Sequence, residues 1–431
     1  MRVVHINAVY GAGSTGRAVM ELNDELKKRE NESYVFCSNV SDEKHGIFCM
    51  GTPFTRAIHA FLSRLTGLQG YFSYGATKKL IRQLDIIKPN IVHLGNLHGN
   101  YIHVNMLLDY LAENDIPTVI TLHDCWLFTG HCCHYLEDNC YKWQESCGHC
   151  PARHKWNTSW LFDRSKKVLK DRKERYNKIR SLLIVGVSDW VTNEAKKSIL
   201  RGNAKFERIY NWINLDIFSP HNDLPIKKEK SVLAVSAGWS KRKGLNDIIN
   251  IAKSYPNYQF VMVGKMPDNI RLPLNVQAVG TIKDIDKLAD EYRRADVLLH
   301  LSYEETFGKV IAEALACGTP AVVYDVTAMP ELIGPGCGQV VQLGDWKSAG
   351  EAVNKILNAS DEENGEINKI NDIAERYSKC EVVKENHSTY SKINQSKCCR
   401  NYAISHFDRQ LVIKEWMTAY YQLLQDHQST G

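Results

Sequence analysis

Two glutamates lie eight positions apart in the segment from residue 302 to residue 320. An apolar run over residues 295–301 predicts a strand that ends just before this segment, and a helix is expected to begin at about Gly308. Glu305 would then lie in the connecting loop and Glu313 on the helix. Because an ionised carboxylate offers only acceptor lone pairs, Glu313 suits the vicinal hydroxyls of a ribose and Glu305 the hydroxyls of a second sugar.

The loop between these glutamates also offers backbone donors. The N–H groups of Thr306, Phe307 and Gly308 are expected to be unpaired at the helix start, with the positive end of the helix dipole behind them. Such a helix start favours an anion, for example a phosphate. The alternative interpretation is that the two glutamates mark only a helix start and a solvent-facing charge.

Two other loops have the composition of anion-binding sites. One follows a predicted strand in the second half of the chain and carries Arg242 and Lys243; a basic surface turn is the alternative. The other follows the N-terminal strand and is rich in glycine, which lets a backbone approach a ligand closely. Gly16 and Arg17 are the expected contacts there, although any tight strand-to-helix turn would use similar glycines.

Polar side chains also follow an interior strand predicted at residues 118–122. His123 could contact a bound sugar, and the alternative is a core histidine bonded to a neighbouring carbonyl group. Asp124 could orient His123 or contact an acceptor molecule. His98 is a further expected acceptor contact.

Five of the 13 cysteines fall between Cys132 and Cys150. Cys147 and Cys150 have the spacing of a metal knuckle, and Cys133 and Cys140 could complete a four-thiolate zinc site with them. Reduced cysteines without a metal, and disulfides, are the alternatives.

Short apolar runs alternate with longer amphipathic ones along the chain. This pattern predicts an α/β fold of two doubly wound, Rossmann-like domains with parallel sheets. Such sheets bind ligands at the carboxyl ends of their strands, so we expect the domains to face a central cleft. The expected divisions are an N-terminal domain over 1–208 with a cysteine-rich insert over 131–151, a linker over 209–230, a C-terminal domain over 231–405, and a closing helix over 406–431 that returns to the N-terminal domain.

The expected elements follow from apolar periodicity. In the first half, strands are expected at residues 3–8, 33–37, 91–94, 118–122 and 182–187, and helices at 16–29, 76–87, 104–113, 163–179 and 190–200. In the second half, strands are expected at residues 232–237, 259–263, 276–279, 297–301, 321–324 and 339–342, and helices at 244–254, 285–294, 309–316 and 347–357.

The composition is that of a soluble globular protein, with 44% hydrophobic and 24% charged residues among 431. No apolar run is long enough to span a bilayer, and the first residues lack the apolar core of a signal peptide. A cytoplasmic protein is therefore expected. The formal net charge of +5 excludes little.

Two segments have the composition of a membrane-surface contact. Between Arg164 and Arg180 there are nine Lys or Arg against two acids, which suits anionic head groups or nucleic acid; a solvated helix face is the alternative. Between Phe54 and Tyr74, aromatic and aliphatic residues neighbour arginines, and an ordinary buried helix with its loop is the alternative. We expect peripheral contact with the inner face of the membrane and no nucleic-acid partner.

The segment from residue 302 to residue 320 resembles the signature of the retaining glycosyltransferases of family four, which have the two-domain GT-B architecture. The resemblance covers most of the chain and is tightest at three other places, residues 10–17, 121–129 and 235–244. It implies that Glu313 holds the nucleotide ribose. It also implies that the donor sugar is held by Glu305, Thr306, Phe307 and Gly308.

The resemblance also assigns residues to the transfer site. It places Lys243 on the diphosphate and His123 beside the donor sugar, so that His123, Glu305 and Lys243 are the implied catalytic residues. Typical members carry an arginine where this chain has Trp239, and Arg242 or Lys241 is expected to replace it.

What the resemblance implies is transfer of a hexose-type sugar from a UDP- or GDP-linked donor to a saccharide, most simply a lipid-linked one. Retention of the anomeric configuration and a role in capsule, exopolysaccharide or lipopolysaccharide synthesis go with it. The leaving phosphate would accept the proton, so no cofactor is expected in the reaction and zinc would be structural. The alternatives are a nucleotide-sugar epimerase of the same architecture and a non-catalytic nucleotide-sugar-binding partner, which the departure at Trp239 favours.

Overall fold

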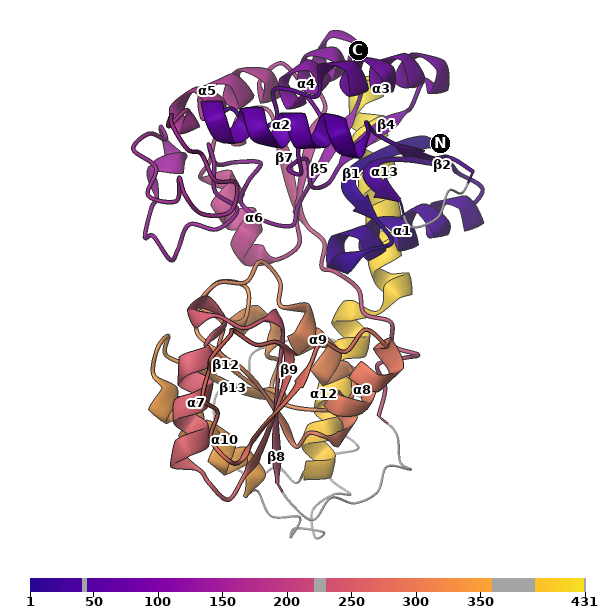
Figure 1. Ribbon diagram of the computed structural model, residues 1–431. Coiled ribbons are helices and arrows are strands. Elements are labelled where there is room, and N and C mark those ends of the chain that lie inside the picture. Colours follow the sequence, from indigo (N-terminus) through magenta and orange to yellow (C-terminus); the bar gives the residue numbers. More distant parts are fainter. Residues whose placement is uncertain (41–44, 221–229, 359–391, 430–431) are drawn as a thin grey trace. The chain divides into compact units, whose positions relative to one another are not determined.

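The computed structural model describes residues 1–40, 45–220, 230–358 and 392–429. Parts of the expected linker (221–229) and of the expected C-terminal domain (359–391) lie outside these ranges. The chain forms two compact units, one made of Met1–Asn211 and Gln410–Gly431 and the other of Trp212–Arg409. Each unit is a parallel sheet with helices packed on it (Figure 1). The predicted fold of two doubly wound parallel sheets is confirmed.

The first unit contains a seven-stranded sheet in the order β3-β2-β1-β4-β5-β6-β7. Its central strands consist of buried, mostly apolar residues, because helices cover both faces of the sheet. The strands are β1 (Arg2–Tyr10), β2 (Glu32–Val40), β3 (Ile47–Cys49), β4 (Ile91–Leu94), β5 (Thr118–Leu122), β6 (Leu182–Gly186) and β7 (Lys205–Arg208).

The helices of the first unit follow the strands as crossovers. Helix α2 shows how local residues set its ends: Thr52 and Thr55 form a capping box at its start, and Gly67 ends it with a positive φ of 73°. The helices are α1 (Gly13–Lys28), α2 (Pro53–Thr66), α3 (Tyr74–Ile87), α4 (Val104–Glu113), η1 (Lys142–Gln144), α5 (Ser165–Tyr176) and α6 (Asp189–Lys196).

A helix from the far end of the chain completes the first unit. Helix α13 (Arg409–Ser429) packs on strand β4, where Nδ1 of the buried His93 lies 2.6 Å from the Tyr420 hydroxyl. The Trp416 ring lies 4.9 Å from the His93 ring. Among the described residues, no helix combines the length and the apolar character needed to cross a bilayer.

The second unit contains a six-stranded parallel sheet in the order β10-β9-β8-β11-β12-β13. The strands are β8 (Ser231–Gly238), β9 (Gln259–Lys265), β10 (Val276–Gly280), β11 (Val297–His300), β12 (Ala321–Tyr324) and β13 (Gly338–Val341). The helices are η2 (Lys241–Lys243), α7 (Leu245–Ser254), α8 (Ile285–Arg294), α9 (Lys309–Ala316), η3 (Pro330–Leu332), α10 (Trp346–Leu357) and α12 (Lys392–Phe407).

The two segments through which the chain passes between the units are paired with each other. The Ile213 N–H group donates to the Phe407 carbonyl at 2.9 Å, and Ile213 also bridges Asp408. The Arg400 guanidinium on α12 donates to the carbonyls of Leu215 and Phe218 at 3.1 and 2.6 Å. The entry and exit of the second unit are therefore fixed together.

Candidate functional site

Two loops meet at the carboxyl edge of the second sheet. Strands β8 and β11 are parallel neighbours, so the loops that follow them start side by side. The Tyr303 N–H group donates to the Arg242 carbonyl at 2.8 Å. Gly244 approaches the other loop so closely that a Cβ there would lie 2.2 Å from the Leu301 carbonyl oxygen. The close contact between the two loops therefore restricts which residues each loop can carry.

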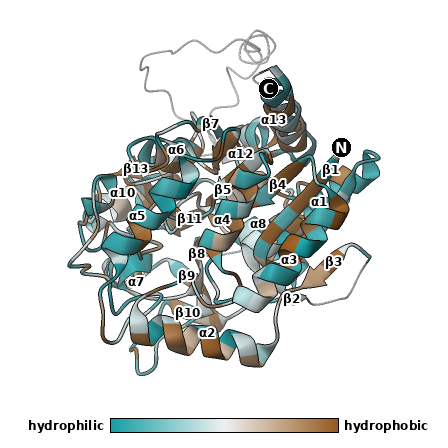
Figure 2. Cartoon of the chain, turned by 90° about the horizontal axis from the view of Figure 1, so that it is seen from above, coloured by the Kyte–Doolittle hydropathy of each residue, from teal (hydrophilic) through white to brown (hydrophobic). Residues whose placement is uncertain are grey.

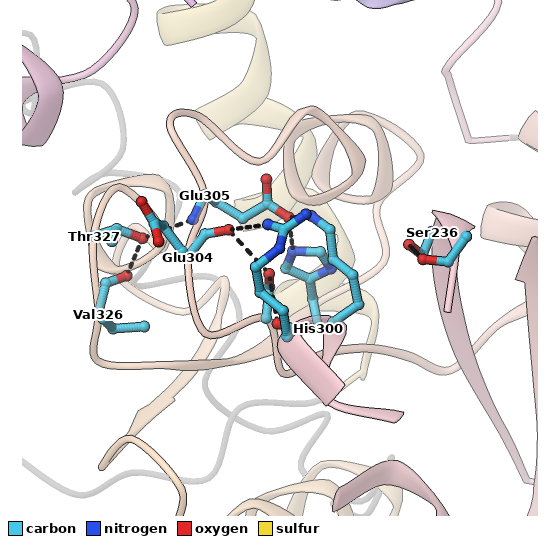
Figure 3. Close-up of polar contacts among 10 residues, drawn as sticks. Ser236, His300, Glu304, Glu305, Val326 and Thr327 are labelled. Carbon is cyan, nitrogen blue, oxygen red and sulfur yellow. Dashed lines mark hydrogen bonds and ion pairs between the residues drawn. The ribbon is translucent and has the colours of Figure 1, made fainter. Parts of the chain in front are cut away.

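Glu305 is the centre of the polar contacts in these loops (Figure 3). Its Oε1 atom forms an ion pair with Lys243 Nζ and lies 3.2 Å from His300 Nε2. Its backbone N–H group donates to the Thr327 hydroxyl at 3.1 Å. Burial would raise the pKa of Glu305, but the charge of Lys243 and the hydrogen bond from His300 outweigh burial and hold this pKa well below its usual range. Glu305 is therefore an ionised acceptor.

The neighbouring glutamate has a different environment. Glu304 is 1% exposed, and its carbonyl accepts hydrogen bonds from the Ser302 hydroxyl at 3.2 Å and from Arg242 Nη1 at 3.3 Å. The Arg242 guanidinium, predicted to replace the missing arginine, thus reaches across to the loop that carries Glu305.

Trp239 occupies the position where the resemblance implies an arginine. Its side chain is buried, and its indole N–H group donates to the Val263 carbonyl on β9 at 3.1 Å. Gly264 makes room for this arrangement, because a Cβ there would lie 1.8 Å from the Ser236 carbonyl oxygen. Trp239 is therefore a packing residue of the sheet edge.

Helix α9 begins where the sequence predicted it. Gly308, with φ 91°, is its N-cap, and Phe307 before it is buried, with its ring 5.8 Å from that of Phe407. The Phe307 side chain thus packs inside the second unit, and only its backbone is a candidate for ligand binding. Thr306 is partly exposed between Glu305 and Phe307.

Glu313 lies on α9 and is buried, with 7% of its surface exposed. Its Oε2 atom accepts a hydrogen bond from the Tyr292 hydroxyl on α8 at 2.9 Å. This bond fixes the carboxylate and uses one of its acceptor positions. A ribose would have to share the carboxylate with Tyr292.

In the first unit, the glycine-rich turn leads from β1 into α1. Gly16 is buried in the first turn of α1, where a Cβ would lie 3.0 Å from Val9 Cγ2. Its carbonyl accepts the Gly11 N–H group at 2.9 Å. Close packing of α1 on β1 therefore explains why residue 16 is a glycine. Arg17 next to it is partly exposed, and its role as a ligand contact stays a prediction.

His98, His123 and Asp124 lie together after β4 and β5. Asp124 Oδ2 lies 2.8 Å from His98 Nε2, and Asp124 Oδ1 accepts the Trp126 N–H group at 2.8 Å. Burial would lower the pKa of His98, but its bond to Asp124 outweighs burial and raises this pKa. Burial, only partly offset by Asp124, lowers the pKa of His123 to about 4. His123 is therefore neutral at neutral pH.

The predicted metal ligands divide into two groups. Cys140, Cys147 and Cys150 line one small cavity, and the cysteine that joins them there is Cys132. Cys133 lies elsewhere: its sulfur, the His98 nitrogen and an Asp124 oxygen are all within 4.8 Å of one another. The structure thus brings together three of the four predicted ligands.

Sequence reasoning missed four residues of these sites, one of which is Tyr292 beside Glu313. His300 and Thr327 contact Glu305, and Cys132 lines the cysteine cavity. His300 is a polar residue at the carboxyl end of an apolar strand, which was a usable signal. Thr327 lies far from Glu305 in the sequence, and no local pattern marks it.

Models of two protein families match the chain. The family described as "Glycosyltransferase Family 4" matches residues 15–217. The family described as "Glycosyl transferases group 1" matches residues 216–372. The two matches meet at the division between the two units and together run from residue 15 to residue 372.

Named relatives are distant. The N-acetyl-alpha-D-glucosaminyl L-malate synthase of Bacillus anthracis is 25% identical over 202 residues, 42% of this chain and 52% of the relative, so the chain spans about half of its length. The alpha-monoglucosyldiacylglycerol synthase of Acholeplasma laidlawii is 24% identical over 72% of this chain and 76% of its own. The sucrose-phosphate synthase of Thermosynechococcus elongatus has a similar fold, with a TM-score of 0.65 and 16% identity over 99% of both chains.

Proposed function

We propose that this chain, which belongs to family 4 of the glycosyltransferases and has their GT-B architecture, moves a sugar from a UDP- or GDP-linked donor to a saccharide acceptor. We further propose that the anomeric configuration is retained and that the acceptor is lipid-linked. The observation that carries the proposal is the contact between Lys243, Glu305 and His300 at the carboxyl edge of the second sheet.

This contact suits a donor that has a negative end and a hydroxyl-rich end. Lys243 is paired with Glu305, and each side chain is about one-fifth exposed, at 19% and 18%. A diphosphate with more charge than one carboxylate would compete for Lys243. Glu305, once released from Lys243, would remain ionised beside His300 and accept hydrogen bonds from the sugar hydroxyls.

The chemical step requires stabilisation of the negative charge that grows on the leaving diphosphate. Lys243, Arg242 and the N-terminus of α9 at Gly308 supply fixed positive charge or dipole for this purpose. The acceptor proton would pass to the leaving phosphate oxygen. His123, neutral at neutral pH, would then position a sugar by hydrogen bonding and would not act as the acid.

The donor site is tested with Lys243→Ala and Glu305→Gln, and with Lys253→Ala as a matched control on the exposed side of α7. A thermal-shift screen with UDP- and GDP-sugars first selects the donor. Loss of a charged hydrogen bond of 1.5–3 kcal/mol should weaken nucleotide binding about 10- to 100-fold in Lys243→Ala. Glu305→Gln should reduce turnover about 100-fold or more and weaken nucleotide binding less. Calorimetry and product analysis measure both.

Two outcomes would reject the proposal. If the Lys243→Ala variant binds the nucleotide as tightly as the Lys253→Ala variant does, Lys243 is not part of the donor site. A chain that binds the donor but never releases nucleotide, with any acceptor extract, would favour the non-catalytic alternative. Release of nucleotide with an unaltered sugar would exclude an epimerase.

The proposal of a lipid-linked acceptor is supported by an exposed apolar face of α2. Phe54, Ile58 and Phe61 lie on one face of this helix and are 73%, 43% and 52% exposed. Next to them, the half-exposed Trp160 packs its ring edge-on to Phe61, with 5.9 Å between centroids. Figure 2 shows hydrophobic turns on α2. A face of this kind suits shallow insertion into a lipid surface.

The basic helix α5 contributes less to this surface than its composition predicted. Arg172 is buried and stacks over the Trp126 ring at 3.6 Å. Lys167 pairs with Asp171 at 2.6 Å. Arg175 pairs with Asp109 at 3.0 Å. The membrane proposal therefore depends on the apolar face of α2 and not on the charge of α5.

Membrane contact is tested by cosedimentation with vesicles of phosphatidylcholine and phosphatidylglycerol at low salt. Replacing Phe54, Ile58 and Phe61 together by Ser should lower the vesicle-bound fraction at least about tenfold, because burial of each side chain contributes roughly 1.5–3 kcal/mol at most. Ile86→Ser on α3, which removes one 71% exposed apolar side chain, is the matched control. Equal binding of the two variants, or no binding of the unmodified chain, would reject the proposal.

A further inference from the structure

Four cysteines of the insert after β5 surround one small cavity. Its volume is about 10 Å³, close to the space of a single water molecule. The four cysteines come from three stretches of the insert that are separated in sequence. The cavity is lined by Cys132, Cys140, Cys147 and Cys150, together with His131 and Trp143.

The backbone around these cysteines is held in conformations that need support. His149, between Cys147 and Cys150, has φ 47°, and Asn139, directly before Cys140, has φ 45°. A residue other than glycine in this region costs about 1–2 kcal/mol. The insert has little regular structure to offset this, since its only described helix is the three-residue η1. A ligand that ties the cysteines together would supply the missing stabilisation.

Two side chains hold the turn between Cys147 and Cys150 in place. Lys142 Nζ donates to the carbonyls of Gly148 and His149 at 3.2 and 3.3 Å, which places an ammonium group beside the turn that joins two of the cysteines. Asp163 accepts the Cys150 N–H group at 2.7 Å and so anchors that turn on the start of α5.

We propose that Cys132, Cys140, Cys147 and Cys150 bind one Zn²⁺ ion as four thiolate ligands. Four sulfur ligands select zinc or iron, and the Cys-x-x-Cys spacing is that of structural zinc sites. Among the described residues, the group whose ligand atoms already lie within 4.8 Å of one another is His98, Asp124 and Cys133, so binding would draw the four sulfur atoms closer together around the ion. On binding, each thiol gives its proton to solvent, and the site acquires a net charge of −2, which the ammonium of Lys142 partly offsets. The Cys147-x-x-Cys150 pair forms the knuckle.

Cys133, although adjacent to Cys132, is excluded from this ligand set by its surroundings. Its sulfur lies with the His98–Asp124 pair, where the two partners already satisfy each other at 2.8 Å and Asp124 also accepts the Trp126 N–H group. This second trio is a hydrogen-bonded pair with a thiol beside it. The two neighbouring cysteines therefore belong to different sites.

The proposed ion would support the predicted acceptor residues through the chain between the two sites. The Cys132 carbonyl accepts the Thr129 hydroxyl at 2.7 Å, and the Cys133 carbonyl accepts the Cys125 N–H group at 3.0 Å. Fixing Cys132 would thus fix the loop from Asp124 to Cys133 against His98. This role in acceptor binding rests on the proposed function, whereas the ion itself does not.

The test is the metal content of the full chain, purified without chelator and without added metal, by elemental mass spectrometry. We expect one zinc per chain, released when a mercurial reagent blocks the thiols. Cys132→Ser should lose most of this zinc, and Cys133→Ser should keep it. Exchange of the ion for Co²⁺ should give the intense charge-transfer bands of tetrahedral thiolate coordination.

Several results would overturn the proposal: a zinc content far below one per chain, iron in place of zinc, a disulfide between any two of the four cysteines, or equal zinc loss in Cys132→Ser and Cys133→Ser. The content of the unmodified chain decides the matter even if Cys132→Ser does not fold. Failure of the metal and failure of the proposed function are distinguishable, because nucleotide binding to the second unit is measured separately. A chain that binds the donor but contains no zinc would reject only the zinc proposal. A chain that contains zinc but does not bind the donor would reject only the proposed glycosyltransferase function.

Discussion

Lys243 and Glu305 hold each other at the point where two loops of the second unit meet. Each side chain would otherwise present an uncompensated charge in a partly buried place, which is costly. In the function proposed above, the diphosphate of a donor would replace Glu305 as the partner of Lys243, and the sugar would replace Lys243 as the partner of Glu305. Donor binding would then require this ion pair to separate.

The protonation of His123 gives a prediction at this scale. In the folded chain its pKa is lowered to about 4, whereas an unfolded histidine titrates near 6.5. Between these values the unfolded chain binds more protons, so the free energy of unfolding falls as the pH drops from about 6.5 towards 4. His123→Gln should make this dependence shallower by up to about 1.4 kcal/mol per pH unit, measured by urea unfolding at several pH values.

The matched control for this experiment is His45→Gln. His45 is exposed, so its replacement removes one histidine from the surface and leaves the buried His123 in place. If the slopes of the two variants coincide, His123 does not carry the proposed proton uptake. His123→Gln also keeps the size and hydrogen-bonding capacity of the side chain, so a loss of sugar transfer without loss of donor binding would support its positioning role.

At the scale of elements, the end of β9 tolerates only glycine. Gly264 has φ 124°, and a Cβ would lie 1.8 Å from the Ser236 carbonyl oxygen on β8. Gly264→Ala should therefore destabilise the second unit by about 3 kcal/mol or more, or lower its melting temperature by roughly 6–12 °C. Differential scanning calorimetry measures the shift.

Gly238 at the end of β8 is the control for Gly264. A Cβ there would meet no atom within 4 Å, so Gly238→Ala should change the melting temperature by less than about 2 °C. If the melting temperatures of the two variants fall equally, the close approach of β9 to β8 is not the cause. Any alanine at a strand end would then have the same effect.

Interior elements were predictable because their pattern is set by burial. The predicted bounds of β4, β5, β12, α4, α8 and α9 coincide with the observed ones. Helix α2 was expected only as the alternative interpretation of residues 54–74. The other missed elements carry little apolar periodicity. β3 and β7 are short edge strands, and β7 reads Lys-Phe-Glu-Arg with no fully buried residue. Helix α12 is rich in polar residues and is held by tertiary contacts such as those of Arg400.

The candidate site, like the fold, was predictable only in part from the sequence. Residues that lie at strand ends or helix starts, such as Glu305 and Lys243, follow from local pattern, and the structure brings these two together. Contacts that depend on packing did not follow. Neither the Thr327 hydroxyl at Glu305 nor the choice between Cys132 and Cys133 leaves a local trace, because in an irregular loop adjacent residues can face different sites.

At the scale of the whole molecule, the second unit is inserted into the first. The chain leaves the first unit after Asn211 and rejoins it at Gln410, and Ile213 and Phe407 pair where these two passages run side by side. Both units are therefore tied at two points of the chain.

The return of α13 has a consequence for how the protein is made. A ribosome releases β4 early, but the partner that His93 requires, the hydroxyl of Tyr420, is synthesised only after the entire second unit has emerged. Until then the nascent first unit lacks the side chains that α13 contributes to it. We therefore expect the sheet of the first unit, although it is translated first, to be completed last.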